Sequence, residues 1–86
     1  MVECFWPGAS EAAVVEATSR LDEASAVLTG TGVLARRTVA TFVPADETVL
    51  WLFEADGEDS LRVLARKAGV RFDRVLAVVT STVVGS

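Results

Sequence analysis

The chain has 86 residues, enough for one domain with a modest core, and 51% of them are hydrophobic. Twelve acidic against eight basic residues and no histidine give a net charge of −4, so the basic composition typical of nucleic-acid binding is absent, and no run of lysines or arginines suggests an anionic membrane. The lone Cys4 excludes an internal disulfide, and we expect a cytoplasmic protein with neither a membrane helix nor a signal peptide.

The first third of the chain predicts a strand followed by a helix. The short apolar run Val2 to Trp6 ends at a Pro-Gly dipeptide, which is typical of a strand that enters a turn. Ser10 stands where a helix N-cap is favoured, and Gly30 or Gly32 is the expected stop. Between them, apolar residues recur at spacings of three and four and predict one buried stripe, formed by Val14, Ala17, Leu21, Ala24 and Leu28.

The middle of the chain predicts a β-hairpin. The β-branched stretch Val33 to Val43 favours a strand that is irregular around Arg36-Arg37. The segment Pro44 to Glu47 has turn residues, because proline presets φ and aspartate bonds nearby amides. Thr48 to Ala55 is then the third strand, antiparallel to the second.

The last third predicts a second helix and a fourth strand. Asp56 and Asp59 occupy the expected N-cap and N3 positions, and Gly69-Val70 indicates a Schellman stop. The apolar and β-branched run Val75 to Val84 favours the fourth strand. The buried stripe of this helix is expected to consist of Leu61, Leu64, Ala65 and Ala68.

The element order β-α-β-β-α-β consists of two βαβ halves joined by the hairpin. Right-handed crossovers in both halves give an α+β, ferredoxin-like plait that forms a single domain over residues 1–86. We expect a four-stranded antiparallel sheet with both helices on one face and with the first and third strands at its centre. The pattern leaves open which face of the sheet meets the helices.

The strands lack the alternation of apolar and polar residues that is expected of a sheet with one solvent-exposed face. Val49 to Phe53 is apolar at five successive positions, and Val75 to Val79 repeats this pattern. Two hydrophobic strand faces in a monomer would favour aggregation, so we expect the bare face to be covered. A homodimer closed face to face, as a dimeric α+β barrel-like assembly, is the first interpretation. A large hydrophobic ligand on that face is the alternative.

Three strings in the sequence, FWPGASEAAVVEA, TFVPADETVLWLFEADGEDSLRVLARKAGV and FDRV, resemble a small bacterial family. This nickel-binding-protein-like family is classed as a domain of unknown function, and the resemblance implies a ferredoxin-like dimer. It also implies a histidine and a cysteine at two positions where this chain has Leu64 and Trp51. Since the chain has no histidine, we expect a degenerate nickel site, no metal and no other cofactor.

Few residues are candidates for a catalytic or ligand-binding site. Cys4 lacks a histidine to stabilise a thiolate, so a buried structural role is expected. Trp6, Trp51 and Phe53 are candidates for the wall of a hydrophobic ligand pocket, and core or interface filling is the structural alternative.

Charged residues on the strands are the weak catalytic candidates. Arg36 and Arg37 could clamp an anion, or they could form surface or intersubunit ion pairs, for instance with Glu54 or Glu3. Glu3 and Glu54 are the acids that the pattern places on strands, where either could act as a general base.

Three functions fit these patterns. The first is a non-enzymatic homodimer that binds a small molecule or a partner. The second is a cofactor-independent enzyme of monooxygenase, cyclase or isomerase type. It would hold a hydrophobic or aromatic substrate among the aromatic residues, with a strand acid as base and Arg36 as anion holder. The third is a subunit that pairs with a different homologous chain through the same sheet face.

Overall fold

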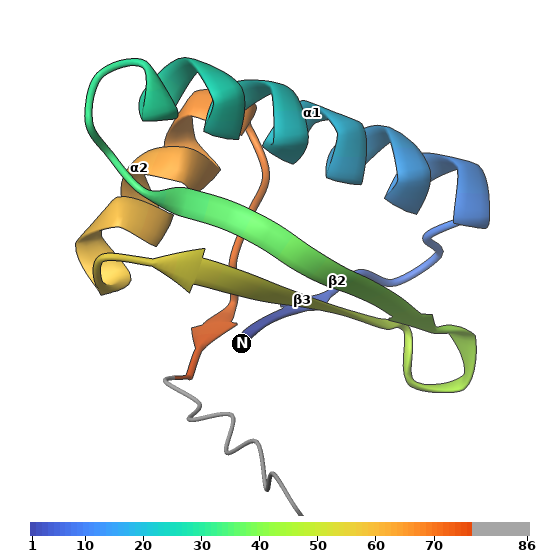
Figure 1. Ribbon diagram of the computed structural model, residues 1–86. Coiled ribbons are helices and arrows are strands. Elements are labelled where there is room, and N and C mark those ends of the chain that lie inside the picture. The colour runs from blue at the N-terminus through green and yellow to red at the C-terminus, as the bar shows by residue number, and fades with distance from the viewer. Residues whose placement is uncertain (77–86) are drawn as a thin grey trace, which may run out of the picture.

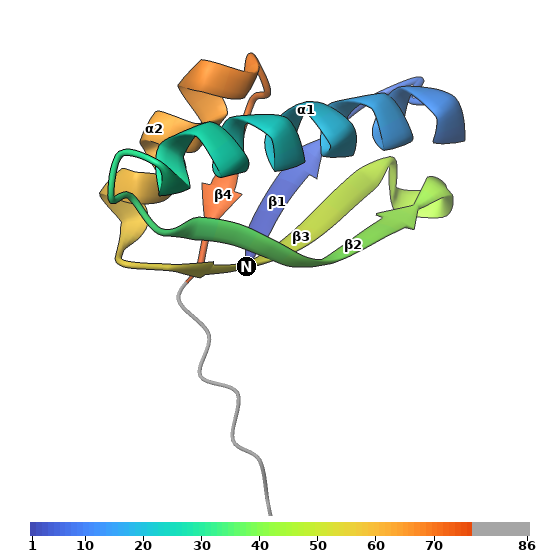
Figure 2. The same cartoon turned by 45° about the horizontal axis from the view of Figure 1, so that its top comes forward.

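The computed structural model describes residues 1–76 and forms one antiparallel sheet covered by two helices. The strand order β2-β3-β1-β4 confirms the ferredoxin-like plait and the central place of the first and third strands. Both helices lie on the same side of the sheet (Figure 2). The elements are β1 (Val2–Phe5), α1 (Glu11–Thr29), β2 (Ala35–Val43), the short 3-10 turn η1 (Pro44–Asp46), β3 (Thr48–Ala55), α2 (Glu58–Ala68) and β4 (Arg74–Val75).

The fourth strand was expected over Val75 to Val84, and most of that range lies outside the described residues. The described part pairs with β1, with Val75 opposite Val2 and Arg74 opposite Glu3. No helix among residues 1–76 has the length and apolar character that crossing a bilayer requires.

Helix α1 begins where the sequence predicts. The Ser10 hydroxyl accepts a hydrogen bond from the Ala13 amide at 3.1 Å, and Gly30 is the C-cap residue. The helix crosses above the hairpin (Figure 1). All members of its predicted stripe are buried against the sheet, namely Val14, Ala17, Leu21, Ala24 and Leu28.

The β2–β3 hairpin has two irregular points. A register shift between Arg37 and Val39 leaves Thr38 as an extra residue, which matches the irregularity expected near Arg36-Arg37. At the turn, Glu47 adopts a left-handed conformation with φ of 50°. Its carboxylate accepts a hydrogen bond from the Gly8 amide at 2.7 Å, so this residue ties the hairpin turn to the loop after β1.

The N-cap prediction for α2 is wrong. The cap residue is Gly57 and makes no side-chain cap bond. Asp56 instead turns to the other side of the loop, where its carboxylate accepts from the Leu34 amide at 3.2 Å. Its own amide donates to the Leu34 carbonyl at 3.2 Å. Local spacing favoured a cap, but the loop before β2 offers Asp56 a pair of backbone bonds.

The end of α2 follows the prediction. Gly69 has φ of 69°, and the Val70 amide donates to the Ala65 carbonyl at 3.0 Å, which is the Schellman arrangement. Three members of the predicted stripe are buried, namely Leu61, Leu64 and Ala68, while the fourth, Ala65, is only partly buried.

The core lies between the helices and one face of the sheet. Val2 and Cys4 of β1 and Val49 and Trp51 of β3 supply the buried residues of the central strands. Because side chains alternate along a strand, these residues identify the face that meets the helices. The opposite face, called the open face below, has no element of residues 1–76 packed on it in either view (Figures 1 and 2).

Candidate functional site

The open face has an apolar centre. Leu50 and Leu52 alternate with the buried residues of β3 and therefore point away from the helices. The strand register sets Val39 opposite Leu52. Phe5, at the end of β1, is 52% exposed. This apolar centre consists of Phe5, Val39, Val43, Leu50 and Leu52, with Thr41 opposite Leu50 and Thr48 opposite Phe5 and Val43 on the same face.

Charged residues flank this centre on two sides. Arg36 pairs with Glu54 at 3.1 Å, and the two side chains are 64% and 59% exposed. The alternative that paired Arg36 with Glu54 is therefore confirmed, and such an exposed pair contributes at most about 1 kcal/mol. Across the sheet, the register places Glu3 beside Arg74. The flanks thus carry two positive and two negative charges.

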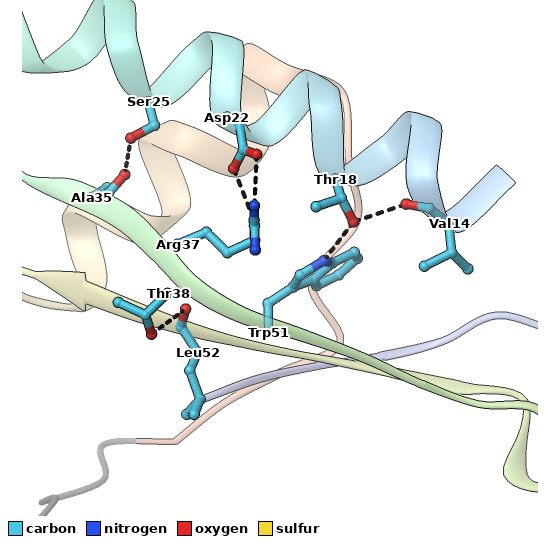
Figure 3. Close-up of polar contacts among 9 residues, drawn as sticks. All are labelled: Val14, Thr18, Asp22, Ser25, Ala35, Arg37, Thr38, Trp51 and Leu52. Carbon is cyan, nitrogen blue, oxygen red and sulfur yellow. Dashed lines mark hydrogen bonds and ion pairs between the residues drawn. The ribbon is translucent and has the colours of Figure 1, made fainter. Parts of the chain in front are cut away.

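Arg36 and Arg37 do not form one clamp, because they lie on opposite faces of β2. Arg37 reaches the helix layer, where it donates two hydrogen bonds to the Asp22 carboxylate at 2.9 and 2.8 Å (Figure 3). This bonding raises the pKa of Arg37 above its ordinary value. The pair fastens β2 to α1, so Arg36 is the one of these two arginines that lies on the open face.

Trp51 lies in the core and is fully buried. Its indole N–H donates to the Thr18 hydroxyl at 3.1 Å, and that hydroxyl donates to the Val14 carbonyl at 2.8 Å (Figure 3). The ring also packs against Phe72, with 5.9 Å between centroids. This placement makes Trp51 a filled and hydrogen-bonded part of the core.

Phe53 lies on the helix side of β3, near the other end of the domain. Its ring is 5.9 Å from that of Phe72, centroid to centroid. It also lines a hollow of about 220 Å³ together with Leu61, Val75 and Leu76.

Trp6 lines a different cavity, of about 340 Å³, between the end of β1, the middle of α1 and the end of α2. We call it the Trp6 slot and define it by Cys4, Trp6, Ala17, Arg20, Val70 and Arg71. Trp51 and Phe53 both lie next to Phe72, but Trp6, Trp51 and Phe53 do not line one common pocket. Neither Glu3 nor Glu54 lines the slot or the hollow beside Phe53.

Sequence reasoning missed Thr18, Arg20 and Arg71. Thr18 carried one signal, because it follows the buried Ala17 and so flanks the stripe of α1. Arg20 and Arg71 are far apart in the sequence, and no local pattern brings them together at the slot.

Cys4 is buried, as expected. Burial raises the pKa of its thiol, the negative charge of Asp73 raises it further, and Arg71 opposes these effects. The thiol is therefore protonated near neutral pH and is not poised as a nucleophile.

The two positions that the family resemblance would fill with metal ligands lie in the core. Leu64 and Trp51 both have an exposed fraction of 0%. Within residues 1–76, no three acidic or cysteine side chains gather closely enough to hold a metal ion.

Comparisons of the chain with models of protein families, with curated protein sequences and with solved structures find no match. The resemblance to the nickel-binding-like family therefore stays a prediction. The open face and the Trp6 slot are the two candidate sites of this domain.

Proposed function

We propose that this chain is a small non-catalytic binding protein that assembles as a homodimer through the open face of its sheet. The observation that carries the proposal is the apolar centre of that face. Leu50 and Leu52 occupy a central strand, and Val39 extends the apolar surface into β2. Clustered side chains of this kind are typical of the core of an interface, with polar residues at the rim.

Charge favours a second copy as the occupant. The open face carries Arg36 and Arg74 against Glu3 and Glu54, so its formal charge is zero. A twofold dimer brings the same surface against itself, and a neutral face with both signs avoids like-charge repulsion. The open face has no net charge that would complement a strongly charged partner.

The placement of the candidate residues favours binding over catalysis. Glu54, one of the two proposed bases, lies within an ion pair with Arg36, the proposed anion holder. The aromatic residues expected around a substrate do not line one common pocket. Buried Leu64 and Trp51 at the expected ligand positions are in line with a degenerate metal site. Among residues 1–76, no specific arrangement favours the cofactor-independent enzyme.

Light scattering coupled to size-exclusion chromatography tests the proposal. The measured mass of the natural chain should be twice the 9.1 kDa of one chain. Val39→Glu, on the open face, should give a monomer, because each copy would bring a buried charge to the interface. Val27→Glu is the matched control, because Val27 is 54% exposed on α1 and Val39 is 45% exposed.

The control variant should remain dimeric. A natural chain that stays monomeric at high concentration would contradict the proposal. So would a Val39→Glu variant that is folded and as dimeric as Val27→Glu. If the chain instead dimerised only with a different homologous chain, the third function would replace the first.

A further inference from the structure

We propose that the Trp6 slot binds a small amphipathic monocarboxylate, with its apolar body beside Trp6 and its carboxylate between Arg20 and Arg71. The slot lies on the helix side of the sheet and is separate from the open face. This ligand site is therefore independent of the proposed dimer and can be tested apart from it.

The inner part of the slot suits an apolar group. Trp6, Ala17 and Val70 supply its apolar walls, and Cys4 lies among them. Because the Cys4 thiol stays protonated, the slot has a neutral interior. A cavity of about 340 Å³ is at the lower end of the range for ligand pockets, which fits one aromatic ring or a short acyl chain.

Arg20 supplies a cation at the mouth of the slot. It extends from α1 toward the end of α2, so that a Cβ at Gly69 would lie 3.8 Å from its Nη1 atom. Its guanidinium makes no hydrogen bond or ion pair with any other residue in the described range 1–76. An exposed guanidinium of this kind can donate hydrogen bonds to a carboxylate without first breaking an internal pair.

Arg71 supplies a second cation, which is held by two contacts. Its Nη2 donates to the Phe5 carbonyl at 2.7 Å, and its Nε lies 3.1 Å from an Asp73 carboxylate oxygen. These two contacts hold the side chain beside the slot and leave its Nη1 group for a ligand. A fixed guanidinium loses little conformational freedom when it binds an anion.

The charge balance favours an anion with one negative charge. Arg20 and Arg71 bring two positive charges to the slot, and the nearby Asp73 carboxylate removes one of them. The end of α2 adds a partial negative charge, which Arg66 and Lys67 in its last turn offset. A net charge of about +1 matches a monocarboxylate better than a phosphate.

The surroundings of the slot add to this preference. Five of the eight basic residues in the chain line the slot, line the groove next to it or lie in the last turn of α2, although the net charge of the chain is −4. They are Arg20, Arg62, Arg66, Lys67 and Arg71. This local concentration of basic residues would attract anions to an otherwise acidic protein.

Titration with phenylacetate tests the proposal, with phenylacetamide as the uncharged control. Binding is followed by calorimetry and by the NMR signal of the Trp6 indole N–H. We expect phenylacetate to bind and to shift the Trp6 signal, while the Trp51 signal, in the core, shifts less. The amide should bind at least tenfold more weakly, because it carries no charge and cannot form an ion pair with the guanidinium groups.

Two substitutions that each remove one positive charge locate the site. Arg20→Gln should weaken phenylacetate binding roughly tenfold or more. Arg36→Gln should change it less than about threefold, because Arg36 lies on the open face, on the other side of the sheet from the slot. Both substitutions replace exposed side chains, so circular dichroism should show folded proteins.

Several results would overturn the proposal. These are an absence of phenylacetate binding at millimolar concentration, equal binding of the amide, or equal losses in Arg20→Gln and Arg36→Gln. The dimer variant Val39→Glu should bind phenylacetate as the natural chain does. This keeps a failure of the slot distinguishable from a failure of the dimer.

Discussion

The hydrogen bond between Trp51 and Thr18 gives a quantitative test of the packing between sheet and helices. Thr18→Val keeps the shape of the side chain but removes the acceptor of the Trp51 indole N–H, 3.1 Å away. Because Trp51 is fully buried, the donor would be left unpaired in the core, which costs about 1–3 kcal/mol. Threonine and valine have similar helix propensities, so this loss should dominate.

We therefore expect the free energy of unfolding to fall by about 2 kcal/mol, and Tm to fall by roughly 8–16 °C for a domain of this size. Urea unfolding followed by circular dichroism, at one fixed protein concentration, measures the change. Thr18→Ser is the control, since it keeps the hydroxyl and should cost no more than about 1 kcal/mol for the lost methyl group.

A second background isolates the bond itself. In Trp51→Phe the donor is absent, so adding Thr18→Val should cost less than about 0.5 kcal/mol beyond Trp51→Phe alone. The reasoning would be refuted if Thr18→Val were as stable as the natural chain. It would also be refuted if Thr18→Ser were as damaging as Thr18→Val.

Three further predictions follow from particular contacts. Gly69→Ala should cost about 1 kcal/mol in thermal unfolding because φ is 69°, whereas Gly57→Ala, with extended φ of 174°, should be neutral within about 0.5 kcal/mol. The raised thiol pKa of Cys4 stabilises the fold fully below the ordinary thiol pKa, so stability should fall as pH rises above about 8.5, and Cys4→Ala should flatten this slope. Arg36→Met should change urea stability by less than about 0.5 kcal/mol, and Arg37→Met by about 1 kcal/mol, because only Arg37 makes a bidentate, partly buried pair.

Local signals predicted much of the fold. Ser10 caps α1 through a bond to an amide three residues away, and Gly69 stops α2 through its own backbone conformation. Both devices depend on neighbours in the sequence, so spacing alone reveals them. The N-cap prediction for α2 was wrong because Asp56 bonds to Leu34, which lies 22 residues away. A cap prediction from spacing does not include such a competitor.

The faces of the sheet were also predicted only in part. Five successive apolar residues in Val49 to Phe53 correctly indicated two apolar faces, but not which of them meets the helices. That choice depends on how α1 and α2 pack, and it sends Trp51 to the core while Leu50 and Leu52 stay on the open face. In β2, the bulge after Arg37 changes the alternation, and its consequence for Val39 follows only from pairing with β3.

The candidate sites were the least predictable part. Residue type suggested that Trp6 and Trp51 could line one pocket, but one lies at the slot and the other bonds to Thr18 across the core. The slot itself is assembled from β1, α1 and the end of α2. Arg20 and Arg71 therefore meet only in three dimensions.

The central claim is that a second copy covers the open face. The most direct measurement is an isotope-filtered NOE experiment on a mixture of labelled and unlabelled chains. It should show contacts between copies from the methyl groups of Leu50, Leu52 and Val39, with none from Val27 on α1. Contacts between copies that involve Val27 and not the two leucines, or no contacts between copies at all, would contradict the claim.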